Sequence, residues 1–209
     1  GGGEGRGRGG RGRGNATDIA LGVDYARISG ATIQNYSFGG YVESLTAKTA
    51  YENAYASSLL VAAAGNNGRP LGPCGVCAQF YPAAYTYVLG VQDILYSNYD
   101  SDGPIFTRHS QQLNYELKTP STGINSTVPN GGYRLLTGTS MATPLVAGAM
   151  ALYHKEKPSD SKELIFGNLI NTSGSTYVDF KAAIEITPTP LLKFISAENK
   201  DDINSQNGN

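Results

Sequence analysis

Residues 138–148, with the sequence GTSMATPLVAG, are the most restrictive stretch of this chain. A glycine-rich loop there leads into a segment of mostly small residues, which lets other backbone pack closely against a helix that must run through the core. Pro144 lacks an N–H group, so it fits the first turn of this helix better than the interior. Ser140 then lies at the helix N-terminus, where unpaired N–H groups and the helix dipole favour a developing negative charge. This position suits a reactive hydroxyl, but the spacing alone favours an ordinary N-cap.

Upstream of this stretch, the hydrophobic pattern predicts alternating helices and strands. A helix is expected from Asn15, with Asn15 or Thr17 as its cap and Gly30 at its end. A strand over 31–37, a helix over 43–57 and a strongly apolar strand over 59–64 should follow. A strand, a helix and a strand of this size imply a parallel pair joined by a crossover, with any site at the carboxyl ends of the strands.

The rest of the chain predicts further short elements. A strand is expected over 86–92, and a hairpin over 123–137 with its turn at 129–132. After the serine stretch, Ser159 or Ser161 should cap a helix that ends near Asn171. These elements indicate an α/β fold built on a mostly parallel sheet with helices on both faces.

A second polar element ends the apolar strand. The sequence AAAGNNG over 62–68 places small residues where backbone can approach a ligand, and Asn66 adds an amide that can donate hydrogen bonds. Taken alone, Asn-Asn-Gly is typical of a simple turn. The sequence of this segment therefore leaves both interpretations open.

Three segments together resemble the subtilisin-like serine peptidases, the subtilases. Residues 138–148 are similar to the family's serine motif, Ala-Ala-Gly-Asn at 63–66 to its oxyanion-hole segment, and Ser-Phe-Gly at 37–39 to the segment that binds the substrate backbone; the three occur in the family's order. The resemblance implies that Ser140 is the nucleophile and that Asn66 stabilises the oxyanion. It also implies that an extended substrate lies between two segments, which consist of Ser37, Phe38 and Gly39 and of Ala63, Ala64 and Gly65. A cis peptide bond between Tyr81 and Pro82 is a further implication of the resemblance.

The resemblance covers residues 15–186 and implies a subtilisin-like three-layer fold with the N-terminal part of the domain absent. Residues 1–14, rich in glycine and arginine, are expected to be a flexible segment, and 187–209 a linker or the start of a following domain. The sequence does not decide whether calcium is bound as a structural ion. No other metal and no cofactor is expected.

The family's aspartate and histidine motifs are not found in this sequence. His154 lies fourteen residues beyond Ser140, about 21 Å away along one helix, and His109 has no helix or glycine context typical of a base. The triad Asp and His are therefore expected upstream of residue 1, in a longer multidomain chain, and the 209-residue chain alone is expected to be inactive. The alternative is a non-catalytic subtilase-like module that binds peptides.

Composition argues against several other functions. The chain has 209 residues and a net charge of −1, and it contains no apolar run near the ~20 residues of a membrane span. Residues 1–14 carry four arginines but no aromatic residue on which a base could stack, so RNA binding is not expected. We expect a monomer that binds a peptide or protein substrate and neither nucleic acid nor membrane.

Two cysteines, Cys74 and Cys77, follow the Asn66 segment. A zinc site would need a second pair of ligands, and a redox motif would open a helix. A local disulfide is the favoured interpretation over two free thiols. Together with the family resemblance, it predicts an extracellular, secreted protein.

Overall fold

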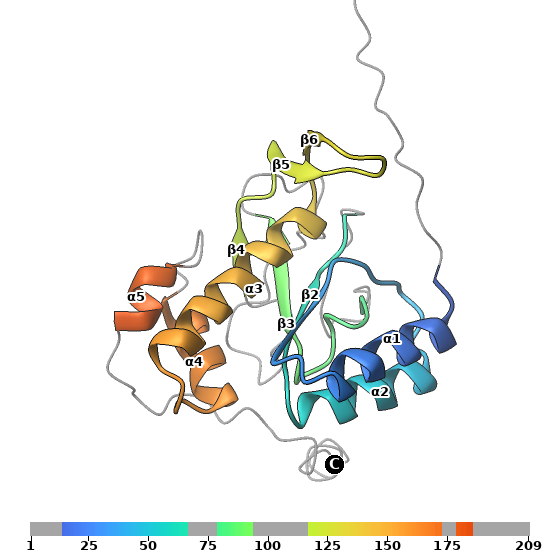
Figure 1. Cartoon of the computed structure of the whole chain (residues 1–209), viewed down its shortest axis with the longest axis horizontal. Coiled ribbons are helices and arrows are strands. Elements are labelled where there is room, and N and C mark those ends of the chain that lie inside the picture. The colour runs from blue at the N-terminus through green and yellow to red at the C-terminus, as the bar shows by residue number, and fades with distance from the viewer. Residues whose placement is uncertain (1–13, 67–78, 94–116, 173–178, 186–209) are drawn as a thin grey trace, which may run out of the picture.

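The computed structural model describes residues 14–66, 79–93, 117–172 and 179–185 (Figure 1). Within these ranges the chain forms, in order, α1 (Ala16–Ile28), β1 (Ile33–Tyr36), α2 (Leu45–Tyr55), β2 (Leu59–Ala63), β3 (Leu89–Asp93), β4 (Leu117–Thr119), β5 (Ile124–Thr127), β6 (Tyr133–Leu136), α3 (Thr139–Glu156), α4 (Lys162–Thr172) and α5 (Phe180–Glu185). None of the helices in the described ranges is long and apolar enough to cross a membrane.

The first four strands form a parallel sheet in the order β1-β2-β3-β4. Tyr36 pairs with Ala62, and Ala63 pairs with Val91, so the carboxyl ends of β1, β2 and β3 meet at one edge of the sheet. The strands β5 and β6 pair separately as an antiparallel hairpin (Figure 1). The predicted crossover between two parallel strands is confirmed.

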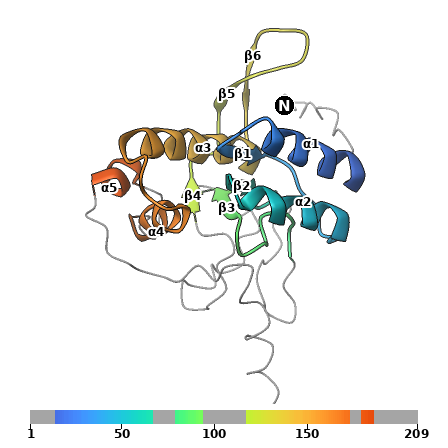
Figure 2. The same ribbon diagram turned by 60° about the horizontal axis from the view of Figure 1, so that its bottom comes forward.

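Helices cover both faces of the parallel sheet. Figure 2 shows α1 and α2 on one side of the strands and α3, α4 and α5 on the other. All five residues of β2 are buried, because alternate side chains enter two different cores. Leu60 and Ala62 pack in the core beneath α2, and Leu59 and Val61 in the core beneath α3. The predicted α/β fold with helices on both faces is confirmed.

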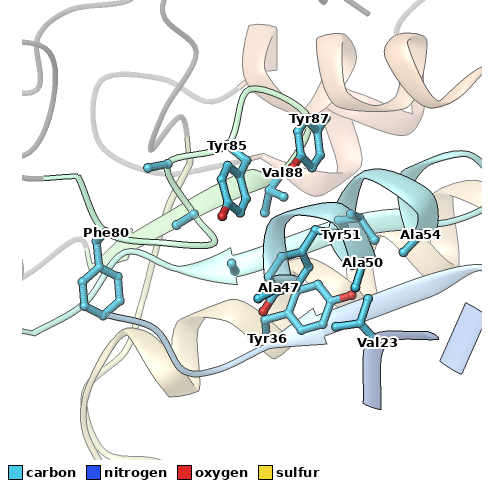
Figure 3. Close-up of a cluster of buried hydrophobic side chains, with 14 of the residues drawn as sticks. Val23, Tyr36, Ala47, Ala50, Tyr51, Ala54, Phe80, Tyr85, Tyr87 and Val88 are labelled. Carbon is cyan, nitrogen blue, oxygen red and sulfur yellow. The ribbon is translucent and has the colours of Figure 1, made fainter. Parts of the chain in front are cut away.

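The core beneath α2 is rich in tyrosine (Figure 3). The Tyr36 and Tyr51 rings meet edge to face with centroids 4.9 Å apart, and those of Tyr85 and Tyr87 stack at 5.3 Å. The prediction of a strand over 86–92 is wrong at its start, because the observed strand, β3, begins only at Leu89. The backbone before it turns instead, with the Val88 N–H donating to the Tyr85 carbonyl at 3.0 Å, because both tyrosine rings point into the core.

Local capping determines where several helices begin and end. Asn15 caps α1, since its Oδ1 accepts from the Asp18 N–H at 2.8 Å, and Gly30 follows the helix with a φ of +81°. The second helix is two residues shorter at each end than predicted, and Ser44 is its cap. Ser161 accepts from the Leu164 N–H at 3.2 Å at the start of α4, as predicted.

Candidate active site

Ser140 is the second residue of α3, at the carboxyl edge of the sheet. The N-cap of this helix is Gly138, which has no side chain, so the interpretation of Ser140 as an ordinary N-cap is wrong. The Ser140 hydroxyl instead donates to the carbonyl of Ser37, with an Oγ–O distance of 3.0 Å. No acidic side chain lies in the first turn of α3, so the positive end of the helix dipole is not neutralised there.

Leu145, Gly148 and Leu152 are exposed, so α3 packs only one face against the sheet and does not run through the core as predicted. Pro144 is the sixth residue of α3, whereas the sequence predicted it in the first turn. A residue with an N–H group at this position would donate to the Ser140 carbonyl, and proline cannot. The Ser37 hydroxyl takes over this role, donating to the Ser140 carbonyl at 2.9 Å. Its proton is directed there because the Ser37 Oγ accepts a bond from the Asn35 amide at 3.0 Å. Two reciprocal hydrogen bonds therefore tie Ser140 to the end of β1.

Asn66 lies beside the same turn through its contacts with Thr139. The Asn66 Oδ1 accepts from the Thr139 N–H at 2.8 Å and lies 3.0 Å from the Thr139 Oγ1. These contacts hold the amide oxygen toward α3, which leaves the amide nitrogen as the group able to donate to a substrate. A Cβ at Gly138 would lie 3.2 Å from that nitrogen, and the φ of Gly138 is +143°, so only glycine suits this position.

Thr139 is the residue of this site whose contacts the sequence did not predict. Its hydroxyl is buried and also accepts from the Gly65 N–H at 3.2 Å, which joins the end of β2 to the start of α3. The available signal was the position of Thr139 directly before Ser140, within the serine stretch. What it contacts depends on residues more than 70 positions away, which no local pattern reveals.

The two predicted substrate segments differ in exposure. Phe38 is 46% exposed and Gly39 is exposed, whereas Ala63, Ala64 and Gly65 are buried. The Ala64 N–H donates to the Val91 carbonyl at 2.9 Å, so it is used within the protein. The first segment is therefore the accessible edge, and the second forms a buried wall close to Thr139.

An open cavity of about 680 Å³ borders the first segment. It is lined by Phe38 and Gly39 together with residues of α1, α2 and the turn after Tyr81, among them Ile19, Ala47 and Tyr85. Its lining does not include Ser140, Asn66 or Gly65. The cavity thus borders Phe38 and Gly39 without reaching the candidate nucleophile.

Several predicted features lie outside the described residues, namely His109, Cys74 and Cys77. Among the described residues, no group of three or more His, Cys, Asp and Glu side chains is placed to hold a metal ion. The bond between Tyr81 and Pro82 is cis, as the resemblance implied.

A family model described as the subtilase family of peptidases matches residues 5–202 of this chain. Alkaline elastase YaB of Bacillus sp. (strain YaB) is 36% identical over 156 residues, which cover 74% of this chain and 38% of that protein. Subtilisin DY of Bacillus licheniformis is 34% identical over 155 residues, covering 74% of this chain and 54% of that protein. The chain thus spans about half the length of such relatives or less.

Solved structures show the same similarity in three dimensions. Sphericase superimposes with a TM-score of 0.65 at 31% identity, covering 78% of this chain and 56% of that one. Fervidolysin from Fervidobacterium pennivorans, a keratinolytic enzyme related to subtilisin, gives a TM-score of 0.62 at 26% identity over 82% of this chain and 29% of its own. Both agree with the parallel sheet and helix layers described above.

Proposed function

Because the chain belongs to the subtilase family, we propose that it is part of a serine endopeptidase that hydrolyses peptide bonds through an acyl-enzyme on Ser140. The observation that carries this proposal is that Ser140 follows Thr139 at the N-terminus of α3, while Asn66 is hydrogen-bonded to the same Thr139. Acyl transfer requires a nucleophile and a nearby donor for the oxyanion, together with a general base.

In the proposed reaction the general base takes the Ser140 Oγ proton and later gives it to the leaving amine, after which water hydrolyses the acyl-enzyme. In the first step the Ser140 Oγ attacks the carbonyl carbon of the scissile bond, and the carbonyl oxygen becomes an anion. The Asn66 amide nitrogen and the Ser140 N–H then donate to that oxygen, assisted by the positive end of the α3 dipole. Because Thr139 holds the amide oxygen of Asn66, the nitrogen needs little reorganisation as charge develops. The same chemistry needs no cofactor.

The general base and the carboxylate that orients it are assigned to residues upstream of residue 1. His154, the one histidine among the described residues, is fourteen positions along α3 from Ser140, about 21 Å by helix rise. A base must lie within hydrogen-bonding reach of the nucleophile, directly or through one water. The relatives that this chain matches extend well beyond it, which supports a longer parent protein.

The substrate is proposed to be an extended peptide or protein segment that adds to the exposed backbone of Phe38 and Gly39 as a further strand. Side chains that lie upstream of the scissile bond have room in the cavity of about 680 Å³ beside Phe38. We also propose an extracellular location and a disulfide between Cys74 and Cys77. Two thiols that alkylate without prior reduction, seen by mass spectrometry of protein from an oxidising source, would contradict the disulfide.

Kinetics of the full-length protein on peptide amides test this function. Ser140→Ala should abolish turnover and labelling by a fluorophosphonate, whereas Asn66→Ala should lower kcat by about 10²–10³ and change KM much less. That magnitude is the one known for an oxyanion-hole donor of subtilisin itself and is carried over through the family. Asn53→Ala, an exposed position on α2, is the matched control and should leave kcat unchanged.

Assays of the 209-residue chain by itself test where the general base lies, and assays of the full-length protein test the alternative role. It should not turn over peptides, because the base is absent. Appreciable hydrolysis that Ser140→Ala removes would overturn the assignment of the base to upstream residues. A full-length protein that binds peptides, cleaves none and is not labelled at Ser140 would instead be the non-catalytic module.

A further inference from the structure

The ring of Phe80 lies between the two predicted substrate segments. A Cβ built on Gly39 would lie 2.4 Å from the Phe80 Cε1, and one built on Gly65 would lie 3.2 Å from the Cε2 and Cζ atoms. The two glycines thus face opposite edges of one ring. Figure 3 shows Phe80 apart from the tyrosines of the core, beside the chain that leaves β1.

Several contacts hold this ring in place. Tyr81, the next residue, pairs with Gly40 through two backbone hydrogen bonds of 2.8 and 2.9 Å. The Phe80 carbonyl accepts from the Ala84 N–H at 2.9 Å, and its ring meets that of Tyr41 edge to face with centroids 5.0 Å apart. Phe80 is only 8% exposed, so the ring is a packed part of the core and not a mobile surface group.

This position matters for the residue whose carbonyl is attacked. Its carbonyl carbon must reach the Ser140 Oγ while its oxygen faces Asn66, so its side chain points between the segments 37–39 and 63–65. The Phe80 ring already occupies the space between Gly39 and Gly65. On the basis of the proposed function, we infer that the enzyme cleaves after small residues, glycine, alanine or serine, and that Phe80 determines this specificity.

The cavity beside Phe38 gives a useful contrast. It offers about 680 Å³ to side chains further from the scissile bond, and Phe80 is not among its lining residues. Selection by size is therefore confined to the residue at the cleaved bond. Larger side chains are accepted at upstream positions of the substrate.

Two peptide anilides that differ only in the residue before the anilide, alanine or phenylalanine, test this inference on the full-length protein. We expect the alanine substrate to have a kcat/KM at least about tenfold higher, since misfits in apolar pockets are typically worth 10–200-fold. Phe80→Ala should raise kcat/KM for the phenylalanine substrate by about 10–100-fold and change that for alanine little. Leu152→Ala, which removes an exposed side chain of α3 twelve residues beyond Ser140, is the control and should leave the ratio of the two substrates unchanged.

Three outcomes decide between the possibilities. A parent enzyme that prefers phenylalanine, or a Phe80→Ala variant with an unchanged ratio, overturns the role of Phe80 and leaves the peptidase assignment intact. A parent that cleaves neither peptide and is not labelled at Ser140 overturns the proposed function, and this inference with it. If Phe80→Ala does not fold, Phe80→Leu and Phe80→Val replace it, and acceptance of phenylalanine must increase as the side chain becomes smaller.

Discussion

Replacing Gly39 by alanine should destabilise the protein far more than the same change at the next residue. A Cβ at Gly39 would lie 2.5 Å from the Tyr81 carbonyl oxygen, as well as close to the Phe80 ring. A Cβ at Gly40 would meet nothing within 4 Å. The two variants change the composition identically, so Gly40→Ala is the matched control for Gly39→Ala.

The size of the expected destabilisation by Gly39→Ala follows from the atoms that must move to admit the new Cβ. Ordinary contact needs about 1 Å more than the Gly39 site allows, and overpacking of this kind costs about 1–3 kcal/mol. If the backbone shifts, the two hydrogen bonds between Gly40 and Tyr81 weaken, at about 1 kcal/mol each. Gly40→Ala meets no such obstacle and should stabilise by about 0.4–1 kcal/mol through the unfolded chain. We expect the two variants to differ by about 3 kcal/mol in free energy of unfolding.

Equilibrium unfolding of the 209-residue chain in urea measures this difference. The sequence has 14 tyrosines and no tryptophan, so tyrosine fluorescence and circular dichroism are the two signals. In thermal unfolding the same difference corresponds to about 6–12 °C for a chain of this size. Free energies within about 0.5 kcal/mol of each other would refute the close approach of Gly39 to Phe80 and Tyr81.

Three other predictions concern single contacts. Ser37→Ala should lower the free energy of unfolding by about 1 kcal/mol, since it leaves the Ser140 carbonyl without its donor. The same change should lower it by less in a Pro144→Ala background, because the alanine supplies a helical N–H to that carbonyl. If urea unfolding shows that the effects of the two changes are additive, this interpretation is wrong. Burial raises the pKa of Tyr153 to about 12, and burial also raises the pKa values of Tyr36, Tyr51, Tyr55, Tyr85 and Tyr87. The contribution of these tyrosines to stability should therefore be fully present below about pH 10 and be lost as the pH rises above it, so the protein should be less stable to urea at about pH 11 than at about pH 9. Met150→Ala, at a fully buried position, should cost about 2–5 kcal/mol by the same assay.

Part of this fold was predictable from the sequence, because it depends on interactions between neighbouring residues. Asn15 caps α1 and Gly30 follows it, because a short polar side chain and a residue free to take positive φ serve helix ends wherever they occur. The hairpin was predictable for the same reason, since Asn130 and Gly131 both adopt positive φ in its turn. The serine stretch was recognisable as a whole string of residues.

The limits of the strands and the hydrogen bonds of the candidate site depended on contacts between residues that are distant in the sequence. The start of β3 at Leu89 follows from where the rings of Tyr85 and Tyr87 pack, which no local propensity encodes. The role of Pro144 likewise changed, because a partner 103 residues from Ser140 supplies the missing hydrogen bond.

The sequence by itself therefore determined the order of the main helices and strands and caps such as Asn15, since these depend on neighbours within a few residues. Ser140 and Asn66 became candidates because the segments around them resemble those of the subtilases. Only the tertiary structure decided that Thr139 orients Asn66 and that the Phe80 ring separates Gly39 from Gly65. The physical reason is that hydrogen bonding and steric exclusion act over a few ångströms in space. Which groups come that close is set by the packing of the whole sheet and its helices.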